Sequence, residues 1–118
     1  MKHNSDFKFD LHRGQIGENY LANILKGEIE VKTDFLALKT GNIYIEYESR
    51  GKKSGISTTQ SEWYAFVLSN IIVILIKTKE LKNICKTKGE IKLGGDNNTS
   101  KGVVLPIKEL YDKQVKCN

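Results

Sequence analysis

The sequence predicts a single α/β domain of 118 residues in which a mixed β-sheet is flanked by helices. Segments 28–34 and 42–48 alternate apolar and polar residues, as half-buried strands do. A continuous apolar run at 71–76 is typical of a central strand that is buried on both faces. Segments 11–26 and 78–88 place apolar residues at helical spacing. Strands and helices interspersed in this way indicate the α/β class.

The composition favours a globular protein with an anionic partner. Hydrophobic residues make up 39% of the chain and charged residues 28%, which excludes a disordered polypeptide. The net charge of +5 favours nucleic acid as a partner, although it also suits simple solubility. The longest apolar run, Ile71 to Ile76, is too short to span a bilayer, so we expect no membrane partner. Cys85 and Cys117 lack metal-ligand spacing and no secretory signal is visible, which favours free thiols in the cytoplasm.

The first helix is expected after a polar lead-in at residues 1–10. Gly27 is a plausible end for a helix over residues 11–26. Glu18 lies at the border of the apolar stripe, where its carboxylate points either inward or to solvent. The stripe consists of Ile16, Tyr20, Leu21, Ile24 and Leu25.

The two alternating strands carry a set of carboxylates. Thr40-Gly41-Asn42 is a turn signal between them, and a hairpin would bring Asp34, Glu46 and Glu48 together at one end. Clustered carboxylates repel one another unless a cation neutralises them, and their hard oxygens suit Mg²⁺ or Mn²⁺. The alternative is a solvated strand face with alternating charges.

The second half of the chain predicts two further helices around the 71–76 strand. Thr59 and Glu62 form a capping-box pattern that predicts a helix to about Leu68. The helix over 78–88 should bury Leu81 and Ile84. Residues 91–101 are expected to form a loop, 103–105 a short strand that ends at Pro106, and 107–111 a last helical turn. The core candidates of the capping-box helix are Trp63, Phe66 and Val67.

Asp34, eleven intervening residues, and then Glu46-Tyr47-Glu48 resemble the signature of the PD-(D/E)XK nuclease superfamily. Three longer segments look like a group of small phage-encoded nucleases of that superfamily: IEVKTDF, TGNIYIEYESRGKKSGISTT and GGDNNTSKGVVLPIKEL. The resemblance covers residues 14–110 and implies a restriction-endonuclease-like fold. Two features depart from the pattern. No proline precedes Asp34, and Glu48 replaces the lysine of the E-x-K element, giving the E-x-E found in some restriction enzymes of the superfamily.

The resemblance implies an Mg²⁺-dependent endodeoxyribonuclease, with Mn²⁺ as a substitute, in the cytoplasm of a bacterial or phage-infected host cell. Gln60 and Tyr64 resemble a Q-x-x-x-Y element that follows the catalytic strand, with Gln60 as a catalytic group. A chain this short leaves no room for a separate recognition domain, so structure-selective or weakly sequence-specific cutting is expected. A homodimer would address both DNA strands. The implied metal ligands are Glu18, Asp34, Glu46 and Glu48.

Basic residues after the second strand are expected to contact the DNA backbone, since flexible basic loops commonly contact phosphates. Their alternative is a solvated charge run. Lys32 is a candidate for the role of the missing lysine, or it balances the neighbouring acids. The rival function is a nucleic-acid-binding protein that keeps the nuclease fold without cleavage. The expected DNA-binding residues are Arg50, Lys52, Lys53, Tyr64 and Lys101.

Overall fold

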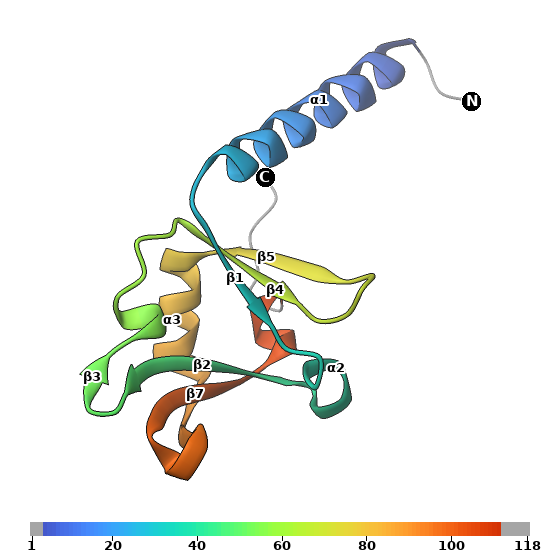
Figure 1. The fold of residues 1–118 in the computed structure, drawn as a ribbon. Coiled ribbons are helices and arrows are strands. Elements are labelled where there is room, and N and C mark those ends of the chain that lie inside the picture. Colours follow the sequence, from blue (N-terminus) through green and yellow to red (C-terminus); the bar gives the residue numbers. More distant parts are fainter. Residues whose placement is uncertain (1–3, 112–118) are drawn as a thin grey trace.

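The computed structural model describes residues 4–111, and side chains from residue 11 onward. Two β-sheets enclose a hydrophobic core, and one helix closes a side between them (Figure 1). The smaller sheet has the order β1 (Ile29–Thr33), β4 (Trp63–Val67), β5 (Val73–Lys77). The larger sheet has the order β3 (Lys52–Lys53), β2 (Asn42–Ser49), β7 (Ser100–Pro106), β6 (Glu90–Gly94). The helices are α1 (Asn4–Lys26), α2 (Ala37–Thr40) and α3 (Thr78–Lys88), with 3₁₀ turns η1 (Gly55–Ser57), η2 (Asp96–Asn98) and η3 (Ile107–Leu110). The chain is thus a small α/β domain, as its sequence predicts.

Helix α1 projects away from both sheets (Figure 1), and the chain measures 62 × 28 × 28 Å. The helix begins at Asn4, so the prediction of a loose lead-in over residues 1–10 was wrong from that residue on. It ends before Gly27, as predicted, and the Gly27 amide donates to the carbonyl of Ile24. Ile24 is buried, but the rest of the predicted apolar stripe is exposed. Tyr20 packs edge-on against Trp63 with ring centroids 6.1 Å apart.

The predicted hairpin between the first two strands does not form. Strand β1 pairs in parallel with β4, whereas β2 pairs antiparallel with β7. The short helix α2 separates β1 from β2 and ends at Gly41, whose φ of +77° allows the chain to turn there. The two strands therefore belong to different sheets, and the mixed pairing occurs in the smaller one.

The helix predicted after Thr59 was wrong, because residues 63–67 form β4. The Thr59 hydroxyl accepts a hydrogen bond from the Ser61 amide, so it closes a local turn instead of capping a helix. Aromatic and β-branched residues favour strands, and this preference overrides the capping-box pattern. Phe66 is buried as predicted, in a strand instead of a helix.

Strand β5 lies at the edge of its sheet and Val73 is 55% exposed, so the predicted central strand buried on both faces was wrong. Residues 90–94 form β6 where a loop was predicted. The predictions of α3, the strand that ends at Pro106 and the final helical turn were confirmed. Leu81 and Ile84 are buried as expected. Cys85 is a free thiol, while Cys117 lies outside the described residues.

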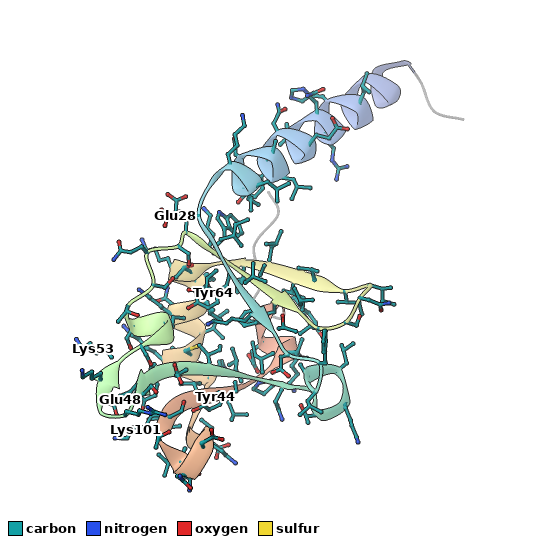
Figure 2. The ribbon with its side chains drawn as sticks, viewed as in Figure 1. Glu28, Tyr44, Glu48, Lys53, Tyr64 and Lys101 are labelled. Atoms are coloured by element: carbon teal, nitrogen blue, oxygen red, sulfur yellow. The ribbon has the colours of Figure 1, made fainter. Side chains whose placement is uncertain are left out.

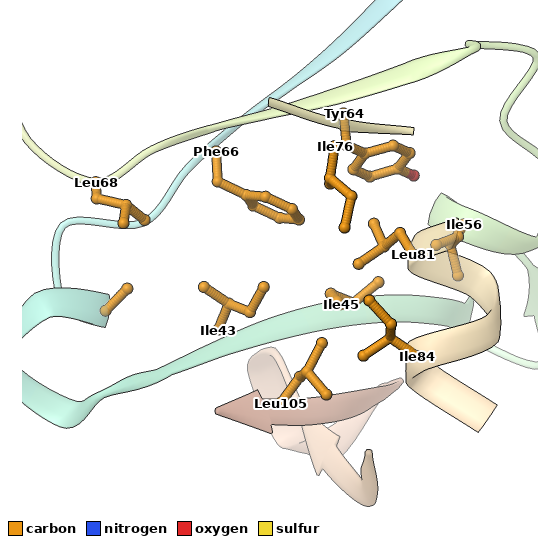
Figure 3. Packing of buried hydrophobic residues seen from close by; sticks show 11 residues of the cluster. Ile43, Ile45, Ile56, Tyr64, Phe66, Leu68, Ile76, Leu81, Ile84 and Leu105 are labelled. Atoms are coloured by element: carbon orange, nitrogen blue, oxygen red, sulfur yellow. The ribbon is translucent and has the colours of Figure 1, made fainter. Parts of the chain in front are cut away.

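The core lies between the two sheets and against α3 (Figure 3). Burying a large apolar side chain contributes about 1.5–3 kcal/mol, so this cluster is the main source of stability. Its members are Tyr64, Phe66, Leu68 and Ile76 from the smaller sheet and the residue after β4, Ile43, Ile45 and Leu105 from the larger sheet, Leu81 and Ile84 from α3, Ala37 from α2, and Ile56 from η1. Polar side chains gather where the two sheets meet at the edge of this core.

Candidate functional site

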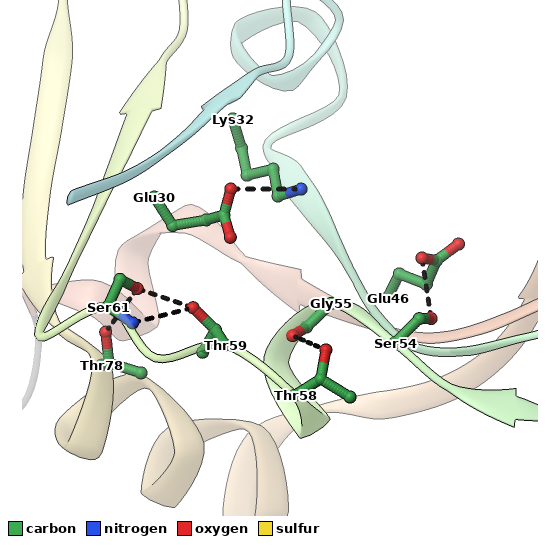
Figure 4. A network of polar contacts seen from close by, with 9 residues as sticks. All are labelled: Glu30, Lys32, Glu46, Ser54, Gly55, Thr58, Thr59, Ser61 and Thr78. Carbon is green, nitrogen blue, oxygen red and sulfur yellow. Dashed lines mark hydrogen bonds and ion pairs between the residues drawn. The ribbon is translucent and has the colours of Figure 1, made fainter. Parts of the chain in front are cut away.

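The carboxylate of Glu46 is held by two serine side chains that come from different parts of the chain. Ser100 Oγ donates to Glu46 Oε1 at 2.7 Å. Ser54 Oγ donates to Glu46 Oε2 at 2.9 Å, as Figure 4 shows. Tyr44 Oη lies 2.9 Å from Ser100 Oγ. Because Ser100 uses its only hydroxyl proton on Glu46, Tyr44 is the donor to Ser100. Hydrogen bonds to an ionised carboxylate are strong, so the orientation of Glu46 is fixed.

Two glycines allow neighbouring groups to lie close enough for this arrangement. Gly55 has a φ of +54°, and a Cβ there would overlap the main-chain carbonyl of Glu46. Gly102 lies under the ring of Tyr44, where a Cβ would come within 2.7 Å of Tyr44 Oη. The Ser54-Gly55 pair and the Ser100-Lys101-Gly102 segment therefore both serve to position Glu46.

Glu46 and Lys32 line one cleft of about 230 Å³, which we call the Glu46 cleft; its other residues include Tyr44, Gly55 and Tyr64. Lys32 comes from β1, and its Nζ lies 3.8 Å from Oε2 of Glu30 (Figure 4). Alternation along β1 places Glu30 and Lys32 on one face of the strand. Glu30-Val31-Lys32 thus has the E-x-K spacing that is missing at Glu46-Tyr47-Glu48.

A second cleft of about 510 Å³ lies beside Glu30 and contains Gln60, Glu28 and Thr59. Gln60 is exposed in the loop before β4, so it is not a helical neighbour of Tyr64 as predicted. Hydroxyl groups of Thr59, Ser61 and Thr78 form a hydrogen-bonded chain at the inner end of this loop (Figure 4). Gln60 therefore lines one cleft with Glu28 and Glu30, on a loop held by side-chain hydrogen bonds.

Tyr64 is 1% exposed and packs against Phe66, with ring centroids 5.8 Å apart. Its hydroxyl has no hydrogen-bond partner among the described residues. Burial raises the pKa of the Tyr64 hydroxyl above its ordinary value of 10.0, and the nearby Thr59 side chain opposes that shift. Tyr64 is thus a core residue that also borders the Glu46 cleft, and its contact with DNA stays a prediction.

The other predicted metal ligands lie apart from Glu46. Asp34 Oδ1 accepts the Leu36 amide at 3.2 Å and so stabilises the turn into α2. Glu48 pairs with Lys101 at 3.3 Å, beyond a β-bulge that interrupts the strand alternation between Glu46 and Glu48. Glu18 is exposed on the projecting helix α1. Among the described residues, no three His, Cys, Asp or Glu side chains lie close enough to hold one metal ion.

The Glu46 cleft nevertheless suits an Mg²⁺ ion that is held by few protein ligands. Mg²⁺ retains several waters and is often held by one or two carboxylates together with substrate phosphates. Each Glu46 oxygen accepts one serine hydrogen bond and keeps a further lone pair for a cation. Glu46 is the carboxylate that this cleft offers to such an ion, while Glu30 lines the second cleft and pairs with Lys32.

The predicted basic residues lie at one end of the larger sheet. Arg50 has a φ of +51° in the turn between β2 and β3, and its amide donates to the carbonyl of Thr99. Lys52 and Lys53 are exposed on β3, and Figure 2 labels Lys53, Glu48 and Lys101 at this end. All four cations lie on the surface near the strand that carries Glu46.

The residues that position Glu46, namely Tyr44, Ser54 and Ser100, were not among the predicted site residues. Ser54-Gly55 and Ser100-Lys101-Gly102 were visible as serine-glycine patterns in segments that carry the family resemblance. Their common target could not be found from one sequence, because Ser100 lies 54 residues from Glu46.

Comparisons of the chain with protein-family models, with curated proteins and with solved structures find no match. Within residues 4–111, no helix combines the length and the apolar character that crossing a bilayer requires.

Proposed function

We propose that the protein is an Mg²⁺-dependent endodeoxyribonuclease that cuts DNA with structure selectivity or weak sequence specificity. The observation that supports this proposal most is the serine-held carboxylate of Glu46 in one cleft with Lys32. An oriented carboxylate beside an ammonium group is what hydrolysis of a phosphodiester requires from the protein. The resemblance of the surrounding segments to PD-(D/E)XK nucleases adds to this support.

Glu46 is the principal candidate for the metal ligand, with Glu30 as a second carboxylate on the neighbouring sheet. A bound Mg²⁺ would supply a water of lowered pKa and would neutralise charge on the phosphate, and Mn²⁺ should substitute. The two serines keep the carboxylate from turning away from the cleft. The resemblance implies further metal ligands at Asp34, Glu48 and Glu18 and a catalytic group at Gln60. We propose these roles for the DNA-bound state.

Lys32 takes the role of the motif lysine in this proposal. Lys32 lines the Glu46 cleft from β1 and its side chain is 49% exposed, so a phosphate has access to it. A cation in this place stabilises negative charge that develops on the phosphate and the leaving oxygen. Arg50, Lys52, Lys53 and Lys101 would hold the DNA backbone beside the cleft.

A plasmid-nicking and oligonucleotide assay tests the proposed activity. The wild-type chain is incubated with supercoiled, branched and single-stranded DNA in Mg²⁺, in Mn²⁺ and in excess EDTA. Cleavage is expected with either metal and not in EDTA, and it should be lost in Glu46→Gln and in Lys32→Met. Glu90→Gln, which changes an exposed glutamate of β6, is the matched control. Cleavage that continues undiminished in EDTA would exclude the metal-dependent reaction.

The second candidate is a nucleic-acid-binding protein that keeps the fold without cleavage. One observation favours it, because Glu48 is paired with Lys101 and the predicted acids are not gathered into one site. Wild-type protein that binds DNA but cuts no substrate in either metal would select this candidate.

A homodimer is the proposed assembly, since two copies would address both DNA strands. Two exposed apolar surfaces support this proposal. Helix α1 exposes Ile16, Leu21 and Leu25, and the outer face of the β1–β4–β5 sheet exposes Val31 and Val73 by more than half. A Cβ at Gly14 or Gly17 of α1 would meet nothing within 4 Å, which leaves room for a close partner.

A further inference from the structure

A cleft of about 600 Å³ lies between α3 and the larger sheet, separate from the Glu46 cleft. Its floor is apolar and includes Tyr47, Ile91 and Val103, and its rim carries Lys53, Lys82 and Lys86. We call it the lysine cleft. Ile91 is 71% exposed, which is a large apolar exposure for a strand residue beside a cleft.

The three lysines come together from two distant segments. Lys82 and Lys86 are four residues apart on α3, so they lie on one helix face, and Lys79 extends that face by three residues. Lys53 is contributed by β3, which is labelled near α3 in Figure 1. Among the described residues, no carboxylate forms an ion pair with Lys53, Lys82 or Lys86. Glu48 lies opposite Lys53 in the strand register but pairs with Lys101.

Helix electrostatics explain only part of this arrangement. A cation in the last turn of α3 interacts favourably with the helix dipole, which accounts for Lys86 without any ligand. It does not account for Lys82 in mid-helix or for Lys53 across the cleft. Like charges that face one another across an apolar floor are stabilised when an anion lies between them.

We propose that the lysine cleft binds an unpaired strand of nucleic acid, with its phosphates on Lys53, Lys82 and Lys86 and a base against Tyr47 and Ile91. Proteins bind single strands by pairing a positive groove for the backbone with apolar or aromatic surfaces for the bases. A duplex keeps its base faces stacked inside, so it would leave the apolar floor uncovered. This inference rests on the proposed nuclease function and names an unpaired segment as the preferred feature of its substrate.

Binding measured in EDTA tests the inference without interference from cleavage. The full chain is titrated against a labelled single-stranded oligodeoxynucleotide and against its duplex, by fluorescence anisotropy over a series of salt concentrations. The variant Lys82→Ala/Lys86→Ala is compared with Lys39→Ala/Lys108→Ala, which removes two exposed lysines elsewhere and has the same net charge. Each lost phosphate contact lowers the salt slope for a single strand by about 0.7.

The expected result is that the Lys82/Lys86 variant loses single-strand affinity by on the order of tenfold and about 1.4 of salt slope, whereas the control does not. Ile91→Gln should weaken binding of the single strand without a change in slope, and should leave duplex binding unaltered. Lys82/Lys86 and control variants that behave alike would overturn the inference, and so would inorganic phosphate that competes as well as the oligonucleotide.

Failure of the inference is distinguishable from failure of the nuclease proposal. If the wild-type chain cuts DNA while the Lys82/Lys86 variant binds single strands normally, the lysine cleft is not the strand-binding site. If the variant loses single-strand binding and the wild-type chain cuts nothing, the lysine cleft is the strand-binding site but the protein is not a nuclease.

Discussion

Ser100 donates a 2.7 Å hydrogen bond to Glu46 across the β2–β7 pair, although the two residues are 54 positions apart. Strand register puts Glu46 opposite Gly102, so Ser100 reaches the carboxylate from two residues along the neighbouring strand. Ser54 completes the arrangement from the following loop. The carboxylate is therefore oriented by two elements that close around it only in the folded chain.

Removing either serine hydroxyl should lower the rate of DNA cleavage. A hydrogen bond to a charged group contributes about 1.5–3 kcal/mol, and about 1.4 kcal/mol corresponds to tenfold in rate. Ser100→Ala and Ser54→Ala are each expected to reduce kcat by roughly tenfold or more, with a smaller change in KM. Ser57→Ala removes an exposed hydroxyl of the same loop that bonds to the Tyr47 carbonyl, and it serves as the control. Equal rates in all three variants would show that the orientation of Glu46 has no part in catalysis.

Gly55→Ala should destabilise the fold more than Gly51→Ala. Both glycines have positive φ, at +54° and +78°, where a Cβ costs about 1–2 kcal/mol. At Gly51 the added Cβ meets nothing within 4 Å, but at Gly55 it overlaps the main chain of Glu46. We expect a further loss of about 1–3 kcal/mol at Gly55, since the strand must shift. Urea unfolding midpoints measure the difference, and equal midpoints would contradict the close approach.

The sequence correctly predicted those elements whose spacing of apolar residues fits only one type of secondary structure. The alternation in 28–34 and 42–48 and the helical spacing of Leu81 and Ile84 were sufficient, because the period distinguishes a strand from a helix. The period did not decide which face of β1 is buried, since Val31 is 57% exposed. Segment 63–67 failed because Trp-Tyr-Ala-Phe-Val is apolar at every position, so its period does not distinguish strand from helix. Local capping chemistry at Thr59 then favoured the wrong choice.

For the candidate site, the sequence indicated individual residues but not which of them lie together. Glu46 was a candidate from residue type and strand parity, whereas Lys32 was left as either a stand-in for the missing lysine or a balance for the neighbouring acids; both line the Glu46 cleft. The expected convergence of Asp34 with Glu46 depended on a hairpin, and strand pairing is a tertiary property that one sequence does not specify. The bulge between Glu46 and Glu48 likewise depends on the register with β7.

Stability should fall with rising pH between about 9 and 11 because of Cys85. Burial raises the pKa of the Cys85 thiol from 9.0 to about 11. The unfolded thiol ionises near pH 9 while the folded thiol keeps its proton, so the contribution is full below pH 9 and is lost as pH approaches 11. The raised pKa of Tyr64 acts in the same direction above pH 10. Cys85→Ala should therefore show a shallower decline than wild type in urea unfolding at pH 8.5 to 10.5, and parallel declines would contradict the assignment.

The apolar face of α1 should mediate self-association. Leu21 and Leu25 are 47% and 63% exposed, so covering them with a second copy would remove apolar surface from water. Sedimentation equilibrium should detect a dimer that Leu21→Glu/Leu25→Glu converts to monomer. Gln15→Glu/Asn19→Glu, at exposed polar positions four residues apart on the same helix, is the control. A wild-type chain that stays monomeric at all concentrations would exclude this assembly.

The variant Asp34→Asn distinguishes two possible metal sites. One consists of Glu46 with Lys32 and Glu30, and the other of the four acids that the family resemblance implies. Asp34 Oδ1 accepts the Leu36 amide, and an asparagine retains that acceptor, so Asp34→Asn should leave the stability of the fold unchanged. If Asp34 moves to the metal when DNA binds, its loss of charge should reduce cleavage by a few orders of magnitude, as Glu46→Gln should, because metal stabilisation of the phosphate contributes several kcal/mol. If the site consists of Glu46 with Lys32 and Glu30, Asp34→Asn should retain most of the activity. Cleavage rates over a range of Mg²⁺ concentrations decide between the two, since a lost ligand also raises the metal concentration needed for half-maximal rate. Metal-free DNA binding should persist or tighten in both variants, because a carboxylate that repels the phosphate has been neutralised.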